Sequence, residues 1–199
     1  MKLKRIGIYG GTFDPIHIAH LVLAERAREQ LELDRVLFLP AALPPHKQDR
    51  GISDGKRRLE MVEIAVAGNP NFEASPLELD RTGVSYTIDT LHDLAKEYPG
   101  VELVLLVGAD MLEDIPNWRL PDEIVRLAKI GYAERPGVEI SHSLDPSRVC
   151  RIEMAQMDIS STEIRSRVRE GRSIRYVVPA GVEAYIHAHG LYRSPGLPR

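Results

Sequence analysis

A glycine pair between a predicted strand and a predicted helix constrains the fold of this chain more than any other feature. Residues 5–9 form a short run with β-branched side chains that predicts a strand, and residues 18–31 have the apolar spacing of a helix. Gly10 and Gly11 stand between them, so the backbone can turn and approach a ligand closely there. The first amides of the helix carry the positive end of its dipole. The segment therefore predicts a phosphate-binding turn at the end of a strand.

Two histidines accompany this turn. His17 and His20 are three residues apart, which places them on one face if both lie in the helix. Imidazoles beside phosphate-binding amides can donate hydrogen bonds to phosphate oxygens and stabilise charge on a leaving group. The alternative is that one histidine caps the helix and the other is merely buried. Their position directly after a strand and a glycine pair favours the functional interpretation.

The order of the predicted elements favours an α/β fold. Nearly continuous apolar runs at residues 35–40 and 101–107 are typical of parallel strands covered on both faces. A strand, a helix and a second strand in this order make a right-handed unit. We therefore expect a Rossmann-like, doubly wound parallel sheet flanked by helices. Strands are predicted at residues 5–9, 35–40, 72–79, 101–107, 129–133 and 149–154, and helices at residues 18–31, 56–67, from 85–91 onward, 121–127, 161–171 and 179–189.

Two further segments leave the carboxyl ends of predicted strands. Residues 41–51 follow the second strand and carry His46 and Lys47, and Gly108 and Asp110 follow the strand at residues 101–107. Ligands of open parallel sheets bind outside the carboxyl ends of the strands. We expect these segments to face the same crevice as the glycine turn.

A second anion-binding helix start is predicted near the C-terminal end. Ser160 or Ser161 with Glu163 forms a capping signature, and Arg165 lies one turn inside the helix. An ordinary capped helix with surface arginines is the alternative for this segment alone. The arginines between residues 167 and 175 extend the positive charge, either as a solvated face or as further triphosphate contacts.

Composition limits the class of protein. The 199 residues include 43% hydrophobic residues, enough for one domain over residues 1–193 with a disordered tail at residues 194–199. A net charge of −3 argues against a dedicated nucleic-acid binder. One cysteine, Cys150, excludes an internal disulfide and fits a reducing cytoplasm. No signal peptide or membrane-length apolar run is evident, so we expect a cytoplasmic protein without a membrane partner. A homo-oligomer is possible.

The motifs also limit the chemistry. The glycine pattern is neither a P-loop nor G-x-G-x-x-G, and the chain has no G-x-S-x-G elbow and no plausible Cys–His pair. A phosphate monoester is already mostly dianionic at neutral pH and needs no such device. It can attack the α-phosphorus of a nucleoside triphosphate directly. No protein ligands for a metal are evident, so Mg²⁺ is expected to be carried by the triphosphate.

Both motifs resemble signatures of the nucleotidyltransferase superfamily. Residues 10–20 resemble its glycine pair, Thr/Ser-Phe-Asp-Pro and HxGH pattern, with Ala19 in place of the usual glycine. Ala19 is the smallest replacement, so closer contact with the nucleotide is expected rather than loss of the site. Residues 160–165 resemble the second signature of the superfamily, ISSTxIR. The resemblance extends to the bacterial nicotinate-nucleotide adenylyltransferases through residues 44–47, residues 85–91, and Gly108-x-Asp110 followed by Trp118.

The resemblance implies adenylyl transfer from ATP to nicotinate mononucleotide, which gives deamido-NAD and pyrophosphate in NAD biosynthesis. His17, His20 and Arg165 would be catalytic, and Trp118 would stack on the pyridine ring. The implied ATP-binding residues are Gly10, Gly11, Thr12, Phe13, His17, His20, Gly108, Asp110, Ile159, Ser160, Ser161 and Arg165. The implied mononucleotide-binding residues are His46, Lys47, Ser85, Tyr86, Thr87 and Trp118.

Three other functions remain open. One is another transferase of the superfamily, such as a phosphopantetheine adenylyltransferase or a cytidylyltransferase. A non-catalytic nucleotide sensor would keep the fold without the reaction. RNA binding through residues 166–175 is the third, and the negative net charge disfavours it.

Overall fold

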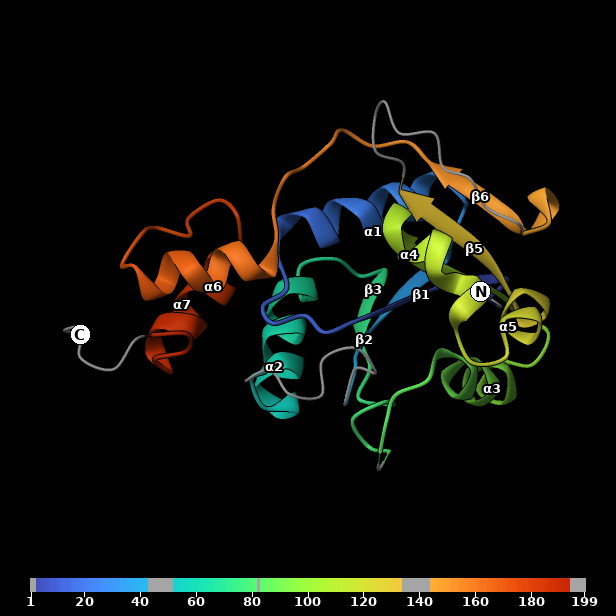
Figure 1. The fold of residues 1–199 in the computed structure, drawn as a ribbon, viewed down its shortest axis with the longest axis horizontal. Coiled ribbons are helices and arrows are strands. Elements are labelled where there is room, and N and C mark those ends of the chain that lie inside the picture. The colour runs from blue at the N-terminus through green and yellow to red at the C-terminus, as the bar shows by residue number, and fades with distance from the viewer. Residues whose placement is uncertain (1–2, 43–51, 82, 134–143, 194–199) are drawn as a thin grey trace.

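Six parallel strands form the sheet at the centre of the computed structural model, which describes residues 3–42, 52–81, 83–133 and 144–193 (Figure 1). Their order across the sheet is β3-β2-β1-β4-β5-β6. This confirms the doubly wound parallel sheet expected from the sequence. The chain reverses its direction of winding between β1 and β4, and this switch point is where such sheets place their ligands. The strands are β1 (Arg5–Gly11), β2 (Arg35–Pro40), β3 (Phe72–Ala74), β4 (Glu102–Gly108), β5 (Ala128–Ala133) and β6 (Val149–Ile152).

Helices cover both faces of the sheet, as buried parallel strands require. The helices are α1 (Ile18–Gln30), α2 (Gly55–Val66), α3 (Thr87–Glu97), α4 (Ala109–Asp114), α5 (Pro121–Leu127), α6 (Ser161–Arg169) and α7 (Ala180–Ala188), with 3₁₀ turns η1 (Ile115–Asn117) and η2 (Pro146–Arg148). Side chains of α1, α2, α6 and α7 share one core, and those of α3, α4, η1 and α5 share the other. In Figure 1, α6 and α7 lie at one end of the molecule and α3 and α5 at the other.

Alternation along β1 divides its side chains between the two cores. Ile6 and Ile8 pack with α3, α4 and α5, whereas Tyr9 packs with the helices of the other face. The packing is tight at Gly7, where a Cβ would lie 2.8 Å from Leu33 Cδ1. The central strand is thus fixed from both sides and presents its carboxyl end, Gly10 and Gly11, at a defined place.

Some predicted boundaries are wrong in instructive ways. The extended segment expected at residues 72–79 is a strand only over Phe72–Ala74, because an amide hydrogen bond from Leu79 to Pro76 turns the chain directly afterwards. Helix α3 is capped by Tyr86, not by Ser85 or Thr87. Most of the loop at residues 41–51 and the predicted tail at residues 194–199 lie outside the described residues.

Candidate active site

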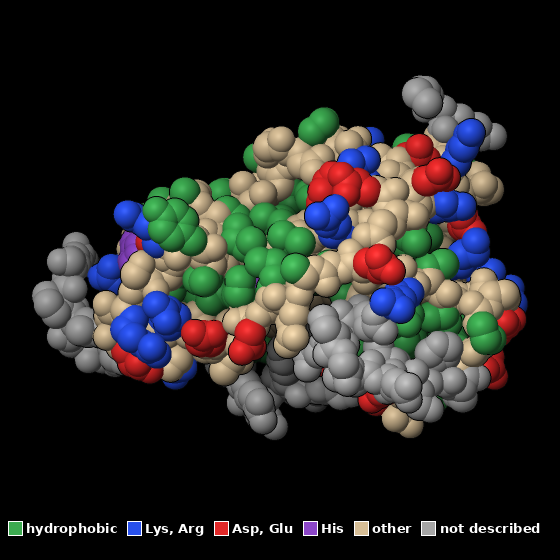
Figure 2. All heavy atoms as spheres, turned by 90° about the horizontal axis from the view of Figure 1, so that it is seen from above, with side chains coloured by type: hydrophobic (Ala, Val, Ile, Leu, Met, Phe, Trp, Pro, Cys, Tyr) green, Lys and Arg blue, Asp and Glu red, His purple; other side chains and the backbone are tan. Residues whose placement is uncertain are grey.

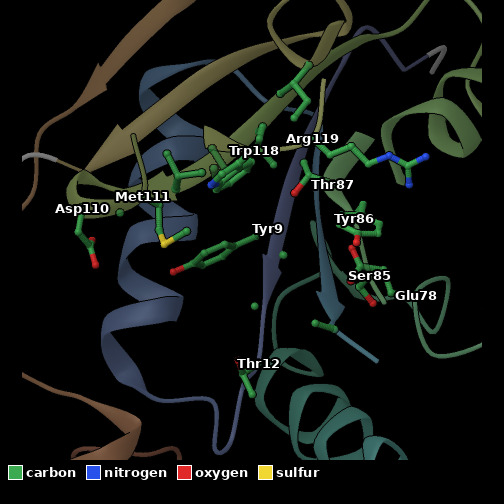
Figure 3. A pocket seen from close by; sticks show the side chains of 18 of the residues that line it. Tyr9, Thr12, Glu78, Ser85, Tyr86, Thr87, Asp110, Met111, Trp118 and Arg119 are labelled. Carbon is green, nitrogen blue, oxygen red and sulfur yellow. The ribbon is translucent and has the colours of Figure 1, made fainter. Parts of the chain in front are cut away.

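A cavity of about 450 Å³ opens at the carboxyl ends of β1 and β4, the predicted switch point (Figure 3). It brings together residues from both groups proposed from the sequence. From the glycine turn and the end of β4 it includes Gly10, Gly11, Thr12, His20, Gly108 and Asp110, and from the other group Ser85, Tyr86, Thr87 and Trp118. His46 and Lys47 lie outside the described residues. Phe13, His17, Ile159, Ser160, Ser161 and Arg165 do not line this cavity.

The glycine turn is shaped by a buried aromatic side chain. Phe13 has a left-handed backbone conformation, with φ of 48°, which a non-glycine residue adopts at a cost of about 1–2 kcal/mol. Its ring is 2% exposed and meets the rings of Tyr9 and His20 edge-on, with centroid separations of 5.6 and 5.1 Å. Packing therefore holds the strained turn in place. Because the ring is buried, Phe13 can contact a nucleotide only through its main chain.

The two histidines meet, although not as residues of one helix. His17 is the N-cap of α1 in an extended conformation, and α1 begins only at Ile18. The rings are stacked, with centroids 3.6 Å apart. The N–H of His17 donates to Nδ1 of His20 at 3.1 Å, so in the neutral His20 ring the proton is on Nε2. The remaining ring N–H of neutral His20 is then at Nε2, and the residue lines the cavity.

His17 is kept neutral by its surroundings. It is 6% exposed, and burial lowers its pKa from 6.5 to about 4. Its Nδ1 is buried and makes no hydrogen bond within the described residues. A buried ring nitrogen without a partner is uncommon in native structures.

The start of α1 offers fewer amides than the sequence predicts. The N–H of Ile18 donates to the carbonyl of Val177 at 3.0 Å, and the N–H of His20 donates to that of His17 at 3.0 Å. These two amides are already bonded, so they contribute less to anion binding. Ala19, the departure from the family pattern, lies half-buried in this first turn.

Helix α6 is anchored on the glycine turn. Its N-cap, Ser160, accepts the N–H of Glu163, which confirms the predicted capping. Ser161 Oγ donates to Pro15 O at 2.9 Å, and Arg165 Nη1 donates to Asp14 O at 2.8 Å. The two segments that carry the signatures, 146 residues or more apart in sequence, therefore lie in direct contact. Ile159, just before the cap, packs at the edge of the core.

The arginines that follow belong mainly to a solvated face. Arg167, Arg172 and Arg175 pair with Glu163, Glu170 and Glu183 at 3.7, 2.8 and 4.0 Å. Figure 2 shows charges of both signs interspersed on one face of the molecule. Such a distribution does not make the continuous basic surface that RNA binding needs.

Trp118 is held at the cavity by side-chain contacts. Its indole N–H donates to Asp114 Oδ2 at 3.1 Å, and Figure 3 shows its side chain at the cavity, which Met111 and Tyr9 also line. The ring is half-buried and lines the cavity, so it is not a core tryptophan. The next residue, Arg119, places its guanidinium 4.9 Å from the centroid of the Tyr86 ring. The tryptophan segment and the start of α3 are thus joined across the cavity.

The start of α3 forms the facing wall. Ser85, Tyr86 and Thr87 line the cavity, and the first amides of a helix have no acceptors within it. Ser85 Oγ accepts the N–H of Ala42 at 2.9 Å, which ties this wall to the segment after β2. Glu78 also lines the cavity, accepts the hydroxyl of Thr90 at 2.9 Å, and has a pKa raised by burial. A helix start of this kind suits a carboxylate or a phosphate.

The end of β4 brings a carboxylate to the same edge. Gly108 lies directly beside this carboxylate, because a Cβ there would be 2.8 Å from Asp110 Oδ1. The side chain of Asp110 is exposed at the cavity. A carboxylate in this position can accept hydrogen bonds from hydroxyl groups of a sugar.

Sequence reasoning missed three side chains around the glycine turn. Asp14 is 2% exposed and its two carboxylate oxygens accept the hydroxyl of Tyr192 at 2.6 Å and the N–H of Ser53 at 3.2 Å. Arg58 is 1% exposed and bonds main-chain carbonyls around the turn. A signal for Arg58 was present, because it precedes Met61 and Val62 by three and four residues and so lies on the buried face of α2. Nothing in the pattern near Tyr192 indicates its contact.

Two further searches apply to the described residues alone. No helix among them is long and apolar enough to cross a membrane. Within the same residues, no group of three or more His, Cys, Asp or Glu side chains is arranged to hold a metal ion.

Comparison with known proteins places this geometry in a family. The family described as cytidylyltransferase-like matches residues 8–167. A protein of Thermomicrobium roseum named "Probable nicotinate-nucleotide adenylyltransferase" is 47% identical, with 96% of this chain and 93% of the relative covered. A protein of the same name from Thermus thermophilus is 47% identical over 95% of this chain and its own full length. A solved structure, Plasmodium falciparum nicotinic acid mononucleotide adenylyltransferase complexed with NaAD, matches with a TM-score of 0.77 and 20% identity over 95% of this chain and 97% of that one, which supports the fold.

Proposed function

Because this chain belongs to the cytidylyltransferase-like family and, within it, to the nicotinate-nucleotide adenylyltransferases, we propose that it joins ATP and nicotinate mononucleotide. The products are deamido-NAD and pyrophosphate, in NAD biosynthesis. One observation carries the proposal beyond the relatives' names. A single cavity is lined both by the glycine turn with His20 and by the group of Ser85, Tyr86, Thr87 and Trp118. Donor and acceptor then bind side by side at the switch point.

The acceptor ring occupies the space between Trp118 and the start of α3. Trp118 is oriented by Asp114, and stacking on a flat, electron-poor pyridine ring contributes about 0.5–1.5 kcal/mol beyond area burial. Amides at the start of α3, near Tyr86 and Thr87, donate to the ring carboxylate. His46 and Lys47, on the segment after β2, hold the phosphate of the mononucleotide. The segment is tied to the acceptor wall through Ala42 and Ser85.

ATP binds on the side of the glycine turn. Gly10, Gly11 and Thr12 allow its phosphates to approach the backbone. Gly108 and Asp110 contact its ribose. Ile159 and the start of α6, with Ser160, Ser161 and Arg165, hold the adenine and the β- and γ-phosphates. The substrate is MgATP, so the Mg²⁺ arrives with the triphosphate and neutralises part of its charge.

The reaction needs no protein nucleophile. The acceptor phosphate is mostly dianionic at neutral pH and attacks the α-phosphorus in line. The oxygen–phosphorus bond to pyrophosphate breaks as the new bond forms, and the leaving group departs with the electron pair. His17 and His20 donate to the phosphate oxygens as charge develops, and Arg165 assists the leaving pyrophosphate. Catalysis is therefore positioning and electrostatic stabilisation.

The proposal also covers the location, the partners and the domain organisation of the protein. The enzyme acts on small-molecule nucleotides in the cytoplasm, without nucleic acid or membrane partners, as one domain over residues 1–193. The pairing of the arginines on and after α6 with glutamates supports the absence of a nucleic-acid partner. Assembly into a homo-oligomer is compatible with it.

Pyrophosphate release tests the acceptor directly. Purified protein is given MgATP with nicotinate mononucleotide, nicotinamide mononucleotide or phosphopantetheine in separate reactions. We expect strong turnover with nicotinate mononucleotide and much weaker turnover with the other two. Turnover with phosphopantetheine instead would contradict the assignment of Trp118 and the start of α3. Absence of turnover with all three, with ATP still bound, would favour a nucleotide sensor.

A further inference from the structure

Arg58 has an unusual environment for a charged side chain. It is the largest of the fully buried side chains among the described residues, and it does not line the cavity. Its guanidinium donates to main-chain carbonyls in three separate segments. Nε bonds Ser53 O at 2.9 Å, Nη1 bonds Thr12 O at 2.8 Å, and Nη2 bonds Ala41 O at 2.7 Å. All three partners are main-chain atoms, so Arg58 acts on the sites through the backbone.

Two of these carbonyls occupy matching positions on neighbouring strands. The last paired residues of β1 and β2 are Gly11 and Pro40, which lie opposite each other. The next residues are Thr12 and Ala41, and the N–H of Ala41 still bonds Gly11 O at 2.9 Å. Beyond this point β1 leads through the glycine turn to the histidines, and the segment after β2 reaches Ala42, which bonds Ser85. Arg58 therefore joins the two segments where pairing in the sheet ends.

The contacts of Arg58 also extend to each side of the cavity. Thr12 and Ala41 both line it. On the acceptor side, Ala42 donates to Ser85 Oγ, directly before α3. On the donor side, Ser53 donates to Asp14, whose main-chain carbonyl accepts from Arg165. Arg58 thus bonds Thr12 of the proposed ATP site directly, and it reaches Ser85 of the acceptor wall through the segment of Ala41 and Ala42.

The chemistry of arginine suits this position. A guanidinium presents five N–H donors in one rigid plane, whereas lysine presents three donors from a single nitrogen. Three carbonyls that approach from different segments can be satisfied together only by the planar arrangement. Burial of this charge is costly, and the negative charge of Asp14 acts in the opposite direction. A chain that needed only a packed core at this place would be better served by an apolar side chain.

We propose that Arg58 is a positioning residue that sets the spacing between the ATP site and the mononucleotide site, an inference that rests on the proposed function. Each site by itself is built from other residues. The distance and angle between the acceptor phosphate and the α-phosphorus depend on the guanidinium that joins Thr12 to Ala41. Replacement of Arg58 therefore slows the reaction between two substrates that are both still bound.

Arg58→Lys tests this role, with Arg57→Lys as the matched control. The substitution keeps the charge and most of the volume but loses the planar set of donors. Arg57 is the preceding residue of the same helix and is exposed. Binding of MgATP alone and of nicotinate mononucleotide alone is measured by calorimetry, and kcat is measured with both substrates saturating. Near-UV circular dichroism and the thermal midpoint report the folded fraction.

We expect Arg58→Lys to bind each substrate within about threefold of the wild type while kcat falls about 10-fold to 100-fold, the size of effect that a misplacement of about 1 Å has on a reaction between positioned groups. Arg57→Lys retains the wild-type kcat. A purely structural role would lower the thermal midpoint and leave kcat per folded molecule unchanged.

Each other outcome overturns a defined part of the reasoning. A folded Arg58→Lys variant with wild-type kcat overturns the spacing role, as does loss of only one substrate with kcat unchanged at saturation. If Arg58→Lys and Arg58→Gln both fail to reach the native near-UV spectrum, Arg58 serves folding and the spacing role is wrong. A wild type that does not join ATP and nicotinate mononucleotide contradicts the proposed function instead.

Discussion

Replacement of His17 by asparagine should reduce the loss of unfolding free energy that the protein undergoes as the pH falls from 6.5 to 4. The ring of His17 is buried at the start of α1, and burial lowers its pKa from 6.5 to about 4. In the unfolded chain the imidazole takes up a proton near its ordinary pKa of about 6.5. Between these two values the unfolded state binds more protons than the folded state. The free energy of unfolding therefore rises with pH across this window.

The size of the effect follows from the shift. One pKa unit corresponds to about 1.4 kcal/mol, so the contribution of His17 amounts to about 3 kcal/mol. It is complete above pH 6.5 and is lost as the pH falls toward 4. His17→Asn removes the titrating group while it keeps a residue that is favoured at an N-cap. Between pH 6.5 and pH 4, the free energy of unfolding of the variant should fall by about 3 kcal/mol less than that of the wild type.

Urea unfolding at a series of pH values measures this difference. The free energies of unfolding of the wild type and His17→Asn are compared at half-unit steps from pH 4 to 7.5. His187→Gln, which replaces an exposed histidine on α7, shows what removal of a histidine as such does to the profile. Parallel profiles for the wild type and His17→Asn would refute the claim that His17 is held neutral by burial.

Three further predictions concern the site and its support. His20→Ala should lower kcat by about 10² to 10³ with folding intact, as expected when one transition-state donor is removed; steady-state kinetics checks this, and a variant with full kcat would exclude His20 from the mechanism. Trp118→Leu should raise KM for nicotinate mononucleotide about threefold to tenfold through loss of stacking, with KM for ATP nearly constant; equal changes in both would show that the ring does not act on the acceptor. Tyr192→Phe removes the hydrogen bond to the buried Asp14 carboxylate and should lower the free energy of unfolding by about 1.5–3 kcal/mol in urea titrations; an unchanged midpoint would mean that this bond contributes no net stability.

The fold could be predicted where local chemistry and packing agree. Residues 35–40 and 121–127 are a strand and a helix with the predicted boundaries. The strand is a continuous apolar run that ends in a proline, and the helix has Pro121 at its first turn, where a missing N–H costs nothing. Ser160 or Ser161 was predicted as a cap, and Ser160 takes that role because its hydroxyl accepts the N–H of Glu163, a contact within four residues. Such signals are local and can be read from the chain.

The parts that could not be predicted depend on contacts distant in sequence. The N–H of Ile18 bonds Val177 O, and Asp14 bonds Tyr192. These contacts join the first twenty residues to the last thirty. The sequence around one partner gives no sign of the other. The cavity could be expected at the switch point, whereas the side chains that support it from behind could not.

The configuration at phosphorus tests the central claim, direct transfer of the adenylyl group to the mononucleotide between two adjacent sites. The protein is given a single diastereomer of ATP with sulfur on the α-phosphorus together with nicotinate mononucleotide, and the configuration of the thio-substituted deamido-NAD is determined. One in-line displacement inverts the configuration, and inversion is the predicted result. Retention would require two displacements through a covalent intermediate on the protein and would contradict the account, as would absence of the dinucleotide.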